Sequence, residues 1–138
     1  MEVRSPVFET ASGGVRATSL MCGNLTWTYN EQNNEIVIEG NGDMESACDV
    51  SKELANRVSI VTIKEGVTSV ADNAFSGWYI VTSATIPEGV RKIGGNGFFS
   101  TAIQSVTIPG SVTSVGHSAF SLCRELSSLT ISEGGSKD

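Results

Sequence analysis

One short pattern, an apolar residue followed by Thr and Ile, recurs along the second half of the chain at a nearly fixed interval. The four copies are Val61-Thr62-Ile63, Ala84-Thr85-Ile86, Val106-Thr107-Ile108 and Leu129-Thr130-Ile131. Consecutive copies of the isoleucine are 23, 22 and 23 residues apart. A period in this range is typical of solenoids in which each unit supplies one short strand and an irregular or short helical return.

Each copy alternates in the manner of a strand with one buried face. Val61 and Ile63 point to one side and Thr62 to the other, and the later copies repeat this alternation. Stacking the strands in parallel aligns the isoleucines in the core. It also aligns the threonines in an outward row on the broad concave face.

The return segments carry two further in-phase features. Apolar residues three positions apart predict a short helical turn after each strand: Val67 and Val70, Val90 and Ile93, Val112 and Val115. A phenylalanine follows in every unit, at 75, 98 and 120. We expect Phe75, Phe98 and Phe120 to stack as a ladder of buried rings.

The stretch from 105 to 123, SVTIPGSVTSVGHSAFSLC, closely resembles the BspA-like, or Treponema pallidum-type, leucine-rich repeat. The resemblance covers about residues 58 to 133 and implies an α/β solenoid with one parallel strand per repeat. Residues 58–138 then hold three full units and the start of a fourth. This sequence departs from the family pattern at Lys64, which replaces a proline, and at Trp78 and Thr101, which stand where the third unit has Cys123.

The amino-terminal part lacks the repeat. Alternating residues at 25–29 and 36–38, separated by the polar run 30–34, predict a β-hairpin. Residues 45–57 are expected to form a short helix with Ser51 as a cap. We assign residues 21–57 as the cap of the solenoid and residues 1–20 as a flexible leader or linker.

Composition restricts the partners. The net charge of −6 and pI near 4.7 have the wrong sign for binding nucleic acid or an anionic membrane. Residues 93–123 contain no Asp, Glu, Lys or Arg, but their many Gly, Ser and Thr residues argue against membrane insertion. Residues 1–20 do not form a secretory signal, so an exported protein would have lost its leader before residue 1.

No residue set predicts catalysis, a metal or a cofactor. His117 is the only histidine and no carboxylate follows it until Glu125, so a surface histidine is the better interpretation. The three cysteines have no metal-ligand spacing. Either Cys22 and Cys48 form a disulfide and leave Cys123 over, or all three are reduced thiols.

The remaining candidate is a surface. We predict a protein-binding site on the concave face, made of Thr62, Lys64, Ser83, Thr85, Ser105, Thr107, Ser128 and Thr130. The resemblance implies a non-catalytic, extracellular or cell-surface adhesion module whose ligand is a host matrix or cell-surface protein. The alternatives are a structural spacer and an accessory domain of a larger secreted protein.

The last strand, expected at 128–132, is followed by six residues only. These are too few to return and cover the open core. We therefore expect an uncapped edge, which either continues into further repeats or self-associates.

Overall fold

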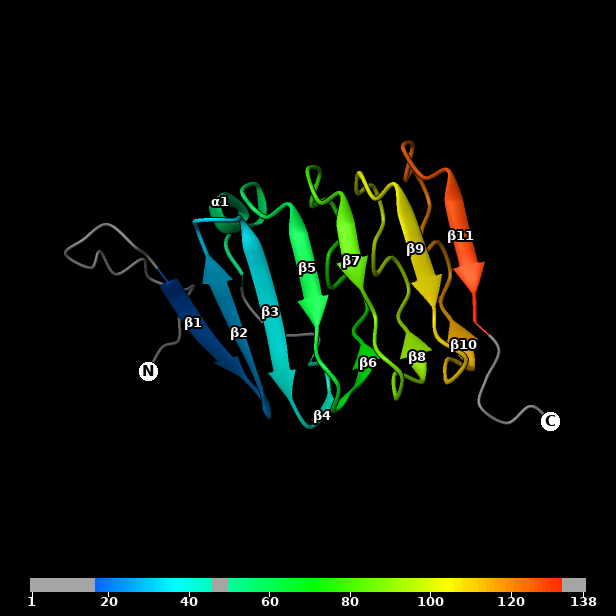
Figure 1. Cartoon of the computed structure of the whole chain (residues 1–138), viewed down its shortest axis with the longest axis horizontal. Coiled ribbons are helices and arrows are strands. Elements are labelled where there is room, and N and C mark those ends of the chain that lie inside the picture. Colours follow the sequence, from blue (N-terminus) through cyan, green and yellow to red (C-terminus); the bar gives the residue numbers. More distant parts are fainter. Residues whose placement is uncertain (1–16, 46–49, 133–138) are drawn as a thin grey trace.

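The computed structural model describes residues 17–45 and 50–132, which form a β-solenoid with two sheets (Figure 1). The larger sheet contains seven strands in the order β1 (Ala17–Cys22), β2 (Leu25–Asn30), β3 (Glu35–Gly40), β5 (Ile60–Ile63), β7 (Ser83–Thr85), β9 (Ser105–Ile108) and β11 (Ser128–Ile131). The smaller sheet contains β4 (Gly42–Asp43), β6 (Val67–Val70), β8 (Lys92–Ile93) and β10 (Ser114–Val115). Its strands pair in parallel, as do β3, β5, β7, β9 and β11. The predicted parallel repeat is confirmed.

The predicted hairpin is β2 and β3, and it belongs to the same sheet as the repeats. β2 pairs with β3 antiparallel, and β3 then pairs with β5 in parallel. Tyr29 closes the hairpin turn, because its hydroxyl donates to Asn34 Oδ1 at 2.9 Å. The Tyr29 side chain is buried, and burial raises the pKa of its phenol.

Two amino-terminal expectations need correction. Residues 17–20 were assigned to a flexible leader, but they belong to β1, which pairs antiparallel with β2. The sequence gives little sign of a strand there, because Leu20 and Met21 are adjacent apolar residues and do not alternate with polar ones. In the structure Leu20 is buried and Met21 is exposed. The helix is also shorter than residues 45–57, because α1 spans Lys52–Ala55. Ser51 does cap it, accepting a bond from the Leu54 amide at 3.1 Å, whereas residues 46–49 lie outside the described residues.

The return segments are strands rather than the short helical turns that we predicted. Gly66 turns the chain from β5 into β6 with a φ of +110°, and a Cβ there would lie 2.4 Å from the Gly40 carbonyl oxygen. β6 then pairs with β4 through an irregular register in which Gly42 faces Val67 and Asp43 faces Ser69. The extra residue, Thr68, shifts the alternation, so Val67 and Val70 both face the core despite their three-residue spacing.

Aromatic rings stack in the predicted ladder, which extends further than expected. Phe75 and Phe98 are buried as predicted, whereas Phe120 is only half-buried. Phe75 lies 5.2 Å from Phe98, and Phe98 lies 5.4 Å from Phe120, measured between ring centroids. Trp27 of β2 adds a fourth ring, 5.7 Å from Phe75. The ladder therefore joins the hairpin to all three repeats.

Strand β11 is an edge of the larger sheet within the part of the chain that the structure describes. Val115, Leu129 and Ile131, which align with the buried residues Ile93, Val106 and Ile108 of the preceding coil, are exposed here. An apolar edge is present, as expected. Self-association through it stays a prediction.

Candidate functional site

The seven-stranded sheet places the predicted binding residues on its outer side. Register aligns Ser83 with Ser105 and Ser105 with Ser128, so the serine row is continuous. We call the outward hydroxyl-bearing side chains of β5, β7, β9 and β11 the hydroxyl face; they are Thr62, Ser83, Thr85, Ser105, Thr107, Ser128 and Thr130. Ile60, which pairs with Ser83, is an apolar neighbour on the same side.

Regular strand pairing joins the threonine row only in part. Thr62 pairs with Thr85, and Thr107 pairs with Thr130. Between β7 and β9, however, the described ladder contains the single pair Ser83 and Ser105. The two strands therefore separate beyond that pair.

Thr62 and Lys64 differ from the rest of the predicted site. Thr62 is half-buried, and its hydroxyl donates to Glu35 Oε2 at 2.6 Å. Lys64 is exposed just after β5, and its amide donates to the Ile38 carbonyl at 2.9 Å. Thr62 is thus already engaged within the chain, whereas Thr85 and Thr107 are exposed.

A groove occupies the place where β7 and β9 separate. It has a volume of about 230 Å³ and is lined by residues 83–86 and 105–107. Four predicted residues, Ser83, Thr85, Ser105 and Thr107, lie around it. We call it the β7–β9 groove. It combines hydroxyl groups with the buried side chains of Ile86 and Val106.

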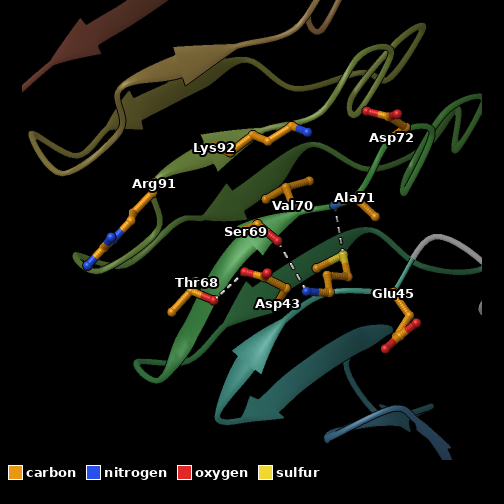
Figure 2. A pocket seen from close by; sticks show the side chains of 10 residues that line it. Asp43, Glu45, Thr68, Ser69, Val70, Ala71, Asp72, Arg91 and Lys92 are labelled. Carbon is orange, nitrogen blue, oxygen red and sulfur yellow. Dashed lines mark hydrogen bonds between the residues drawn. The ribbon is translucent and has the colours of Figure 1, made fainter.

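A larger groove, which the sequence analysis missed, lies over the four-stranded sheet (Figure 2). Its volume is about 700 Å³, and we call it the charged groove. Its lining comprises Asp43, Met44, Glu45, Thr68, Ser69, Val70, Ala71, Asp72, Arg91 and Lys92. These residues come from three successive coils. The charges are visible in the sequence, but their alignment depends on the irregular pairing of β4 with β6.

The floor of the charged groove is held by contacts between coils. The Met44 amide donates to Ser69 Oγ at 3.2 Å, and the Thr68 hydroxyl donates to Asp43 Oδ1. At its far end the Gly95 amide donates to Asp72 Oδ1 at 2.8 Å. Arg91 is fixed through its backbone, since its amide donates to the Thr68 carbonyl at 2.9 Å.

Cysteine and histidine positions give no catalytic arrangement in the described part of the chain. Cys22 is disulfide-bonded, Cys123 carries a free thiol, and Cys48 lies outside the described residues. The Cys123 thiol donates to the Phe98 carbonyl at 3.0 Å. His117 is exposed, and within residues 17–45 and 50–132 its imidazole has no hydrogen-bond partner to orient it.

The described residues also contain no metal-ligand cluster and no helix suited to cross a membrane. No group of three or more His, Cys, Asp or Glu side chains in residues 17–45 and 50–132 could hold a metal ion. In the same ranges, no helix has the length and apolar character needed to cross a membrane.

Two stacked sheets built from a 22–23-residue unit define a repeat protein of the β-solenoid class. The model of the "BspA type Leucine rich repeat region (6 copies)" matches residues 54–137, so the chain belongs to this family. Among the curated proteins, a search finds no match.

Solved structures support the same fold. A leucine-rich repeat protein from Eubacterium ventriosum is 16% identical with a TM-score of 0.53, and the match covers 80% of this chain and 42% of that one. A leucine rich cell surface protein from Faecalibacterium prausnitzii is 19% identical with a TM-score of 0.51, covering 83% and 55%. The pneumococcal vaccine antigen PcpA is 15% identical with a TM-score of 0.50, covering 94% and 39%. The chain thus spans about half or less of the length of these structures.

Proposed function

We propose that this chain is a non-catalytic protein-binding module of a cell-surface leucine-rich repeat protein, and that its hydroxyl face is the binding surface. The observation that carries the proposal is the β7–β9 groove, which lies among four of the eight residues predicted to bind. Membership of the BspA type family and the likeness to a cell surface protein and a vaccine antigen support an extracellular location.

The size and chemistry of the groove favour a protein ligand over a metabolite. Pockets for small molecules usually have volumes of about 300–1,000 Å³. At about 230 Å³, the β7–β9 groove holds one side chain better than a whole metabolite. Ile86 and Val106 line the groove but are almost fully buried, so the exposed hydroxyls of Thr85 and Thr107, which can bond a peptide backbone, are its main contact groups. An extended segment with one small side chain in the groove fits this surface.

The affinity of one module should be low. Strands in a sheet are about 4.8 Å apart, so the four repeat strands span only about 15 Å. Interfaces below about 1,000 Å² are generally transient. Tight adhesion would then come from several modules or ligand sites acting together.

The double variant Thr85→Lys/Thr107→Lys should lower binding to extracellular matrix proteins at least about 10-fold, because two lysines would fill the centre of the interface. Its melting temperature should stay close to that of the unchanged chain, since both side chains are exposed. Surface plasmon resonance on a panel of matrix proteins measures the first effect, and thermal unfolding the second.

The matched control adds the same charge to the other sheet, as Thr113→Lys/Ser114→Lys, and should bind normally. Binding that survives the Thr85 and Thr107 changes would place the site elsewhere. A chain that binds nothing in any format would instead be a spacer, and one that alters the activity of a fused catalytic domain would be an accessory domain.

We also propose that the edge at β11 associates with a second copy of the chain. An edge strand offers unpaired backbone groups, and Leu129 and Ile131 add exposed apolar surface beside them. Light scattering should show a mass that rises with concentration, and Ile131→Lys should abolish the rise. Thr85→Lys, which adds the same charge away from the edge, should not. A chain that stays monomeric at high concentration would exclude this association.

A further inference from the structure

The charged groove separates opposite charges across the small sheet. Figure 2 shows Asp43 and Glu45 on one side of β6, and Arg91 and Lys92 on the other. The strand register sets the separation between the acidic and the basic side chains, because Asp43 pairs with Ser69 and Ser69 pairs with Lys92. An acidic, a hydroxyl and a basic side chain thus follow one another along the solenoid axis.

The two sides do not neutralise each other. Among the residues that the structure describes, no ion pair joins Asp43 or Asp72 to Arg91 or Lys92. The Asp43 carboxylate accepts the Thr68 hydroxyl, and Asp72 accepts the Gly95 amide. Both cations are exposed in a chain whose net charge is −6. The groove therefore presents two fields of opposite sign.

The distance between the fields matches an extended peptide. Two strand spacings of about 4.8 Å place Asp43 and Lys92 about 10 Å apart along the axis. A polyproline II segment advances about 3.1 Å per residue with three residues per turn, so side chains three residues apart lie on one face about 9 Å from each other. The groove is open to solvent, and its volume of about 700 Å³ leaves room for a short peptide segment lying across it.

The geometry points to a second protein-binding site: the charged groove binds a peptide segment in the polyproline II conformation that carries a basic and an acidic side chain three residues apart. The basic side chain lies at Asp43 and the acidic one at Arg91 and Lys92, with the backbone crossing over Ser69. A neutral glycan would leave both charged ends without a partner, and the lining has no aromatic ring on which a sugar could stack. The site is on the opposite sheet from the hydroxyl face and does not depend on its function.

An NMR titration of the ¹⁵N-labelled chain tests this site and locates it. The probe is a blocked peptide with the core Lys-Ser-Ser-Glu, compared at low salt with Lys-Ser-Ser-Lys, Glu-Ser-Ser-Glu and Ser-Ser-Ser-Ser. The mixed peptide should bind about 2- to 5-fold more tightly than the two like-charged peptides, since each exposed charge pair contributes up to about a 5-fold effect. Shift changes should centre on the amides of Asp43, Ser69 and Lys92.

Charge reversal should exchange the preferences. Lys92→Glu should favour Lys-Ser-Ser-Lys, and Asp43→Lys should favour Glu-Ser-Ser-Glu. The matched controls Lys52→Glu and Glu88→Lys change the same charges outside the groove and should keep the preference for the mixed peptide. Because all four positions are exposed, folding is checked directly by the amide spectrum.

Several results would overturn the proposal. Equal binding of all four peptides, no binding of any, or shift changes confined to β7 and β9 would each exclude the site. An unchanged preference in both groove variants would do the same. A sulfated glycan that needs Arg91 and Lys92 but not Asp43 would make the groove an anion site instead of a peptide site.

Discussion

Replacing Phe98 by alanine should lower the free energy of unfolding by about 3–5 kcal/mol, the usual cost of removing a fully buried ring. Phe98 is 0% exposed and stacks on a ring at each side, Phe75 and Phe120. Its removal therefore interrupts the ladder in the middle of the repeats. Denaturant titration measures the loss.

The neighbouring phenylalanine provides the control. Phe99 is half-buried and is absent from the ring stack, so Phe99→Ala should cost clearly less than Phe98→Ala. A loss below about 1 kcal/mol for Phe98→Ala would contradict the ladder as a main source of stability.

Gly94→Ala should be strongly destabilising, with a loss of about 1–3 kcal/mol or more. A Cβ at Gly94 would lie 2.5 Å from the Asp72 amide nitrogen and 2.6 Å from the Ala71 carbonyl carbon. Both atoms belong to the backbone of the preceding coil, so they cannot move aside as a flexible side chain can. The coils would have to separate, and the Gly94 amide would lose its 2.8 Å bond to the Val70 carbonyl.

Gly95→Ala is the matched control for this prediction. A Cβ there would meet its nearest neighbour, the His117 carbonyl oxygen, at 3.4 Å, which is ordinary contact. The change should be neutral or slightly stabilising, because alanine restricts the unfolded chain. Thermal unfolding of both variants measures the two changes in stability. Equal losses of stability would mean that the close approach of the coils at Gly94 is not the cause of the destabilisation.

Features that recur in phase could be predicted from the sequence, because stacking repeats them in space. The parallel strands and the positions of Phe75, Phe98 and Phe120 follow from periodicity alone. The second sheet could not be predicted in this way, since the three-residue spacing of Val67 and Val70 is also the spacing of a helical turn. In the structure, the three-residue spacing occurs in an extended strand because β6 pairs irregularly with β4. Since β4 belongs to another coil, the sequence around Val67 and Val70 does not reveal this pairing.

The candidate sites could likewise be predicted from the sequence only in part. The residues of the hydroxyl face were predicted because their outward positions repeat, but the separation of β7 from β9 depends on a pairing that ends at Ser83 and Ser105. The charged groove was missed because Ser69 and Lys92, which stand at equivalent positions of the repeat, differ in chemistry, and because Asp43 lies before the first repeat. Only the register of three coils aligns them.

The antiparallel hairpin of β2 and β3 also affects the order of folding. Asn30 and Glu35 pair across a turn of 31–34, whereas parallel partners are 22 to 25 positions apart in sequence. Closing the longer loops costs about 1.4 kcal/mol more in chain entropy per step. The hairpin should therefore form first and present β3 as a template for β5, after which each coil supplies the template for the next. Because synthesis proceeds from the amino terminus, a nascent chain would have this template before any repeat has emerged.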